Sequence, residues 1–143
     1  MHATRGNYTI DTDKSKLDVS AIQLFLTNES YWAKERTLEQ TTKAIENSIC
    51  FGLYNETKLI GFGRVVSDQA TFAYIGDVFV IDEFRGQGLS KWLMEMMLEH
   101  PNLQGLRRWV LATQDAHGLY KQFGFDELKH PERWMERPAP NAY

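Results

Sequence analysis

The chain has 143 residues, the size of one ordinary domain with room for a packed core. Hydrophobic residues make up 43% of it and aromatic residues 13%, which excludes a disordered protein. The formal net charge of −3 gives no general attraction to nucleic acid or to anionic lipid, so neither a nucleic-acid nor a membrane partner is expected.

The single cysteine excludes an internal disulfide and fits a reducing compartment. Cys50 stands between Ile49 and Phe51 in an expected strand, so we interpret it as a buried structural thiol. The histidines are scattered without the spacing of metal ligands, and no metal is expected. Neither a signal peptide nor a membrane-spanning apolar run is recognisable, so a cytoplasmic location is expected.

The N-terminal part of the chain predicts one strand and two helices. Residues 1–7 are polar and are expected to form a flexible end, and a first strand is expected from Tyr8. Apolar residues recur every three or four positions after Asp18, which predicts a helix capped by that aspartate. Thr37 and Gln40 have the spacing of a capping box and predict the start of a second helix.

Three strands are predicted next. Residues 49–54 and 59–66 are joined by a short polar connection suited to a hairpin, and a long strand is expected at 70–81. Together they predict an antiparallel meander. Gly76-Asp77 interrupts the last of them, which indicates a bulge or a close approach of another backbone.

The C-terminal part alternates helices and strands. A helix is expected from near Gly88 to before Pro101, followed by a strand at 109–113 and a short helix at 116–123. Residues 125–135 are expected to contribute a last strand or pair of strands with Trp134 packed inward.

The predicted order is βααβββαβαβ. It indicates a mixed α/β fold with a largely antiparallel central sheet and helices on both faces. Nothing divides residues 1–143 into two units, so one domain is expected, with a second flexible end at 137–143.

The junction between the strand ending at Ile81 and the following helix carries the strongest functional signal. Its turn is Arg85-Gly86-Gln87-Gly88. A helix N-terminus attracts anions, glycine lets the backbone approach a phosphate closely, and Ser90 and Lys91 add a hydroxyl and a positive charge. The pattern favours a pyrophosphate cradle, with a plain glycine turn as the alternative.

Two familiar phosphate-binding loops fit poorly. A P-loop requires Lys-Ser/Thr after its last glycine, whereas Leu89 and Ser90 follow Gly88. A dinucleotide fingerprint requires a glycine where Lys91 stands.

The same turn resembles the signature of the GNAT superfamily of acyl-coenzyme A N-acyltransferases. Residues 85–90 are similar to the family's Arg/Gln-x-x-Gly-x-Gly/Ala, with Ser90 departing at the last place, and Val78-Phe79-Val80 is similar to its lead-in strand. About thirty residues downstream, residues 119–125 resemble the family's Leu-Tyr-x-x-x-Gly-Phe. The resemblance covers roughly residues 8–128.

The resemblance implies transfer of an acetyl group from acetyl-coenzyme A to an amine by direct attack. Backbone groups of the lead-in strand would contact the acyl group and pantetheine, and the turn would hold the pyrophosphate. Thr113 stands where the family often has an asparagine that contacts the cofactor. The cofactor-binding residues implied are Val78, Phe79, Val80, Arg85, Gly86, Gln87, Gly88, Leu89, Ser90, Lys91 and Thr113.

The resemblance assigns Tyr120 as the general acid for the departing thiolate. Tyrosine suits this role because its ordinary pKa of about 10 keeps it protonated at neutral pH, although an aromatic here could also belong to the core. His117 and Asp77 are candidate bases, and Asp115 is interpreted as a helix cap. Deprotonation through water is a further option.

In the family the acceptor usually binds near the junction of the first two helices. Here that junction holds Glu29, Tyr31, Trp32 and Arg36. An aromatic pair with a carboxylate would suit a cationic amine, with core packing of the aromatics as the alternative. The acceptor, a small molecule or a peptide amine, stays open, as does a homodimer. A non-catalytic acyl-coenzyme A sensor of the same fold is the alternative function.

Overall fold

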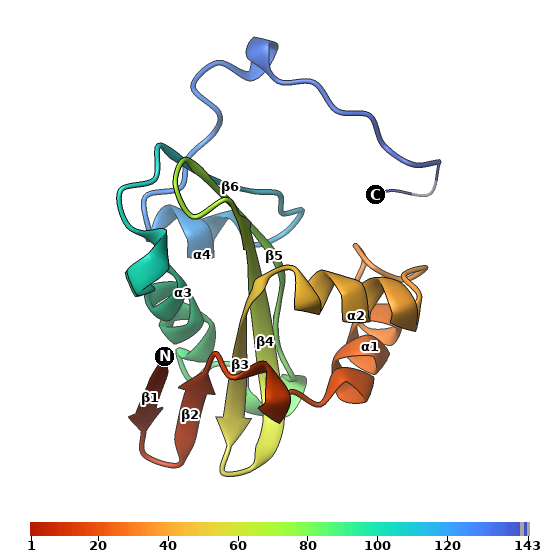
Figure 1. Ribbon diagram of the computed structural model, residues 1–143, viewed down its shortest axis with the longest axis vertical. Coiled ribbons are helices and arrows are strands. Elements are labelled where there is room, and N and C mark those ends of the chain that lie inside the picture. The colour runs from red at the N-terminus through yellow and green to blue at the C-terminus, as the bar shows by residue number, and fades with distance from the viewer. Residues whose placement is uncertain (141, 143) are drawn as a thin grey trace.

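The computed structural model describes residues 1–140 and 142, and its centre is a six-stranded sheet in the order β1-β2-β3-β4-β5-β6 (Figure 1). Neighbouring strands are antiparallel except β5 and β6, which are parallel. The strands are β1 (His2–Arg5), β2 (Tyr8–Asp11), β3 (Ile49–Asn55), β4 (Lys58–Ser67), β5 (Phe72–Val80) and β6 (Arg108–Leu111). The helices are α1 (Val19–Asn28), α2 (Leu38–Glu46), α3 (Leu89–Glu99) and α4 (His117–Lys121). The predicted mixed α/β class is confirmed.

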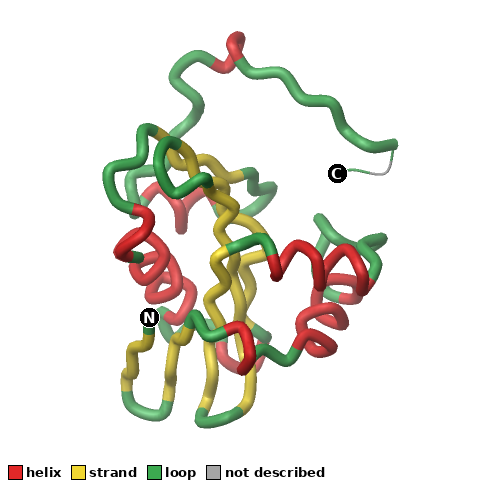
Figure 2. Tube along the Cα trace, viewed as in Figure 1, coloured by secondary structure: helices red, strands yellow, loops and turns green. Residues whose placement is uncertain are grey.

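Helices cover both faces of the sheet, as Figures 1 and 2 show. Neighbouring residues of β3 divide between the faces because side chains alternate along a strand. Cys50 packs with Ile22 and Leu26 of α1, whereas Phe51 belongs to the cluster that contains Trp92 and Leu93 of α3. Each face therefore has its own core.

The helix starts follow from local side-chain chemistry. The Asp18 carboxylate accepts a hydrogen bond from the Ala21 amide at 3.1 Å. Thr37 and Gln40 form both halves of a capping box, which fixes the start of α2. These predicted starts are confirmed.

The prediction of a flexible end at residues 1–7 is wrong for residues 2–5, which form β1 and pair with β2. Arg5 anchors this strand to α3, because its guanidinium lies 4.8 Å from the Trp92 ring and 2.9 Å from a Glu95 carboxylate oxygen. The segment is polar, so its hydrophobic pattern gave no strand signal.

The predicted last strand at 125–135 is also wrong: within the described chain, no residue after Leu111 joins the sheet. This segment carries many charges and a proline, and it extends away from the body of the molecule (Figure 1). Trp134 is 38% exposed and lies under Arg108, with 5.0 Å from guanidinium to ring. Of the expected flexible end, residues 137–140 form no helix or strand, and 141 and 143 lie outside the described residues.

The sheet opens between β5 and β6. Their last paired residues are Ile75 and Leu111, yet β5 continues to Val80. The predicted bulge lies at this point, because the register with β4 shifts and Asp77 adopts a left-handed φ of 54°. A bulge twists and bends its strand, so it separates the two strands where the site lies.

Candidate active site

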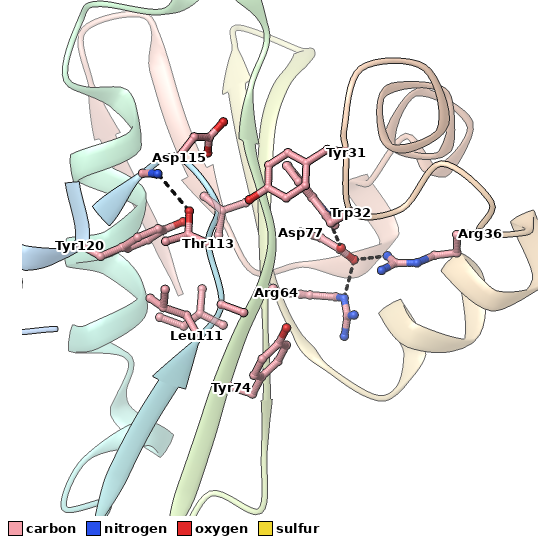
Figure 3. A pocket seen from close by; sticks show the side chains of 15 residues that line it. Tyr31, Trp32, Arg36, Arg64, Tyr74, Asp77, Leu111, Thr113, Asp115 and Tyr120 are labelled. Carbon is pink, nitrogen blue, oxygen red and sulfur yellow. Dashed lines mark hydrogen bonds and ion pairs between the residues drawn. The ribbon is translucent and has the colours of Figure 1, made fainter. Parts of the chain in front are cut away.

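A cavity of about 130 Å³ lies at the opening between β5 and β6 (Figure 3). Its walls come from the α1–α2 connection, β4, β5, β6 and the start of α4. The residues that line it are Tyr31, Trp32, Arg36, Arg64, Tyr74, Ile75, Gly76, Asp77, Val78, Leu111, Ala112, Thr113, Asp115, Ala116 and Tyr120.

Asp77 organises one end of this cavity, and its carboxylate accepts hydrogen bonds from three side chains (Figure 3). The Trp32 indole donates to Oδ1 at 3.0 Å. Arg64 donates from Nε to Oδ2 at 2.6 Å, and Arg36 donates from Nη1 to the same oxygen. The Asp77 side chain is only 3% exposed. It therefore joins the α1–α2 connection to β4 and β5.

This environment keeps Asp77 ionised. Burial by itself would raise the pKa of the carboxyl group, but the charges and hydrogen bonds of Arg64 and Arg36 outweigh it and lower the pKa below its ordinary value. A carboxylate so stabilised accepts a proton poorly. The geometry thus favours a positioning role over the predicted role of general base.

Tyr120 stands on the opposite wall (Figure 3). It is half-buried, and its ring packs edge-on against Phe125 with centroids 6.2 Å apart. Thr113 accepts a hydrogen bond from the Ala116 amide at 3.0 Å, which shapes the loop before α4. The prediction that Asp115 caps this helix is wrong, because the cap position is Ala116. Asp115 lines the cavity instead.

A second cavity, of about 560 Å³, lies along β6 and α4. Leu111, Ala112, Thr113 and Tyr120 line both cavities, so Tyr120 stands on a shared wall. His117 lines the second cavity but not the first. The structure therefore places the two predicted bases, His117 and Asp77, in different surroundings.

The glycine turn has the conformation that only glycine adopts easily. Gly86 has a φ of 80° and Gly88 a φ of 77°, and a Cβ atom at either would meet nothing within 4 Å. The first amide of α3 that bonds back into the helix is that of Trp92, to the Gly88 carbonyl at 3.1 Å. The preceding amides, at Leu89 to Lys91, are those that a helix leaves for a ligand.

Two other predicted cofactor residues brace this turn. Arg85 donates from Nε to the Val80 carbonyl at 3.0 Å, and Gln87 accepts from the Tyr8 hydroxyl at 2.7 Å. Ser90 is half-buried, Leu89 is buried and Lys91 is exposed. The turn is thus held from both β2 and β5.

Residues 78–80 can serve a ligand mainly through their backbone. Phe79 and Val80 are buried, and the Phe79 ring stacks on Phe25 with centroids 3.9 Å apart. Val78 is half-buried and lines the first cavity. Because β6 pairs with β5 only as far as Ile75, no strand of the described residues lies beside this backbone on that edge.

The predicted acceptor residues divide. Tyr31, Trp32 and Arg36 line the cavity, whereas Glu29 is exposed at the end of α1 and does not. The sequence interpretation missed Arg64. Its signal was a lone charge within the apolar run 59–66, beside the strand that carries the bulge.

The described residues hold no group of three His, Cys, Asp or Glu side chains able to bind a metal ion. Within that same part of the chain, no helix is long and apolar enough to cross a membrane.

Comparisons with known proteins agree with this geometry. The family model for the acetyltransferase (GNAT) family matches residues 19–125. A crystal structure from Xanthomonas campestris, described as a "putative acetyltransferase belonging to the gnat family", is 48% identical, covers 93% of this chain and 94% of its own, and superposes with a TM-score of 0.91. A Gibberella zeae protein named "putative acetyltransferase" is 32% identical over 88% of this chain and 83% of its own length.

A predicted acetyltransferase from Clostridium acetobutylicum, solved with acetyl-coenzyme A, has a TM-score of 0.67. It is 16% identical and covers 92% of this chain and 95% of its own, so it shows the fold alone. The extent of the family match and the identity of the relatives decide the class: the chain belongs to the GNAT family of acetyltransferases.

Proposed function

We propose that the protein is an N-acetyltransferase that uses acetyl-coenzyme A and transfers the acetyl group directly to the amine of an acceptor. One observation carries this proposal: a single cavity joins the Asp77 cluster to Tyr120 across the opening in the sheet. Such a cavity lets an amine on one side meet a thioester on the other, and bringing reactants together supplies much of the rate.

The cofactor would lie along the opening and over the glycine turn. The backbone of Val78 to Val80 would pair with pantetheine as an added strand, since β6 leaves that edge of β5 at Ile75. The amides that follow Gly86 would hold the pyrophosphate, because no side chain at the two glycines blocks the approach. Thr113, on the wall shared by both cavities, would contact the cofactor between these points.

The residues around the thioester would divide the proton work. The amide of Val78 or Phe79 would donate to the oxyanion that forms when the amine attacks the carbonyl carbon. Tyr120 would give its hydroxyl proton to the sulfur as the carbon–sulfur bond breaks. Asp115, which lines the same cavity, would attract the incoming ammonium group, which loses one proton to water before the amine attacks. The second proton leaves the nitrogen of the tetrahedral intermediate to water, and the Tyr120 oxygen regains a proton from water. His117 and Asp77 have no part in this proposal as bases.

The test compares Tyr120→Phe with wild type in acetyl-coenzyme A turnover over a panel of amines. We expect kcat to fall by about 10²- to 10⁴-fold, the usual contribution of a general acid, while coenzyme A affinity measured by calorimetry stays unchanged. Tyr54→Phe is the matched control. Its hydroxyl is buried without a hydrogen-bond partner among the described residues, and it lies outside both cavities.

Each outcome separates a part of the proposal. An unchanged kcat in Tyr120→Phe would contradict the role of Tyr120 as general acid but not the acetyltransferase activity. Tight coenzyme A binding without turnover on any amine would favour the sensor instead. Absence of coenzyme A binding would contradict the interpretation of the glycine turn.

A further inference from the structure

One end of the first cavity, formed by Arg36, Arg64 and Asp77 and called the acceptor end here, carries more positive than negative charge. Arg36 and Arg64 both donate to the same oxygen of Asp77, so two guanidinium groups share one carboxylate. Both arginine side chains are largely buried, with 20% and 13% of their surface exposed. One positive charge is therefore left uncompensated in a place that excludes most water, where an anionic ligand would be held strongly.

Both arginines line the cavity and retain donors beyond those used in these hydrogen bonds. A guanidinium has five N–H groups, and those used are Nη1 of Arg36 together with Nε and Nη1 of Arg64, the latter toward Ser48 Oγ at 3.2 Å. Nη2 of Arg64 lies 3.8 Å from the position that a Cβ atom on Gly76 would occupy. A side chain at this position would contact the donor, and glycine has none.

The opposite wall has the other sign. Asp115 lines the same cavity as Tyr120 and is exposed, and no described residue forms an ion pair with it. A ligand with an amine at one end and an anion at the other would match both walls. The volume of about 130 Å³ restricts the part of it that enters to a few heavy atoms.

We propose that the acceptor is a small amine that also carries an anionic group, a carboxylate or a phosphate. Arg36 and Arg64 bind the anion, and the amine points toward Asp115 and Tyr120. This inference rests on the proposed function, since it names the acceptor of the same cavity. It replaces the cationic acceptor expected from the sequence, for which Glu29 was the candidate carboxylate.

Binding is tested first, because it does not depend on turnover. N-acetylalanine and N-acetylalaninamide differ in the anion and resemble the product, and each is added with and without coenzyme A while the melting temperature is followed. We expect the acid to stabilise wild type more than the amide does, and the difference to vanish in Arg36→Gln. Arg137→Gln, an exposed arginine of the C-terminal segment, is the control and keeps the difference.

Turnover gives the second measurement. The ratio of kcat/KM for alanine over alaninamide should fall about tenfold or more in Arg36→Gln, because charge-assisted hydrogen bonds to the anion are lost. Comparing the ratio between enzymes cancels the different basicity of the two amines. Phosphoethanolamine against ethanolamine forms the second arm, and a larger effect there identifies the anion as phosphate.

The failures are distinguishable. Equal stabilisation of wild type by N-acetylalanine and N-acetylalaninamide, with and without coenzyme A, overturns the inference. A kcat/KM ratio that Arg36→Gln leaves unchanged in both turnover comparisons overturns it as well. If kcat/KM were the same with and without the anionic group, the protein would still be an acetyltransferase, but its acceptor would not belong to this class. Loss of coenzyme A binding would instead contradict the proposed function, whatever the acid does.

Discussion

The two ends of the candidate site are built in different ways. The glycine turn at 85–90 is a run of consecutive residues that offers backbone amides, and most of it is exposed. The cluster of Asp77, Arg36 and Arg64 consists of side chains from three separate segments and is largely buried. The first end is specified by local conformation, and the second exists only once the sheet and the α1–α2 connection have come together.

The two constructions have different energetics. A turn with positive φ costs conformational energy at single residues and depends little on its neighbours. Buried charges must each lose water, and their mutual attraction offsets this only when every partner is in place. Removing one member of the cluster should therefore cost far more stability than changing one glycine of the turn.

The largest effect is expected for Asp77→Asn. Asparagine also tolerates the left-handed φ of 54° at this position, so the variant removes the charge with little change in the backbone. Both guanidinium groups then lose their negatively charged partner while they stay largely buried. We therefore expect the free energy of unfolding to fall by about 3 kcal/mol in urea titrations.

Asp126→Asn provides the control, because Asp126 is exposed, and its variant should change stability by less than about 0.5 kcal/mol. If both variants lost equal stability, the cluster would contribute nothing specific, and the contrast between the two ends would fail.

The next effect is a dependence on acid. The pKa of Asp77 is lowered in the folded protein from an ordinary value of 3.8, so the folded state holds fewer protons than the unfolded state below that pH. The stability that this group contributes is present above about pH 3.8 and is lost as the pH falls toward the lower folded pKa. The slope amounts to about 1.4 kcal/mol per pH unit at most for one proton.

Urea titrations between neutral and acidic pH measure this slope. The pKa of Asp11 is lowered as well, since its hydrogen bonds to Lys16 and His2 outweigh the burial that would raise it. Asp11 is present in both wild type and Asp77→Asn, so the difference between the two curves isolates Asp77. Parallel curves would show that the arginines do not stabilise the ionised form.

A smaller effect on stability is expected at the glycine turn. Gly88→Ala forces alanine into a φ of 77°, and Gly105→Ala forces it into 72° at a turn outside the site, with nothing near either Cβ atom. Each should lose about 1 kcal/mol. Only Gly88→Ala should also weaken coenzyme A binding in calorimetry, by about tenfold, because its methyl group would stand where the pyrophosphate approaches. If Gly88→Ala and Gly105→Ala bound coenzyme A with equal affinity, the pyrophosphate would not bind at this turn.

The same contrast explains how much could be predicted from the sequence. Helix starts at Asp18 and Thr37, the bulge at Asp77 and the strand-turn-helix around Gly88 depend on neighbouring residues, and the structure confirms them. The family motif predicted the fold correctly for the same reason, because the residues of each half of the motif are nearly consecutive.

Contacts between distant segments could not be predicted this way. Strand β1 depends on Arg5 reaching α3, and the ion pairs of Asp77 join residues 41 and 13 positions apart, to Arg36 and Arg64. No local spacing shows which charge a buried carboxylate will meet. The sequence therefore suggested a base at Asp77, whereas in the structure Arg36 and Arg64 both donate hydrogen bonds to its carboxylate.

The smallest effect is expected at Cys50, which lies in the core cluster that contains Phe62 and Phe79. Burial raises the pKa of its thiol to about 11, so little thiolate forms near pH 8 and a thiol reagent should label the folded protein far more slowly than the unfolded one. The unfolded thiol has an ordinary pKa of about 9.0, so this group's contribution to stability is present below that pH and is lost as the pH rises toward about 11. Cys50→Ala should cost about 1 kcal/mol or less and leave kcat unchanged. A large loss of kcat would mean that the thiol takes part in acyl transfer, and the direct attack proposed for this site would then be wrong.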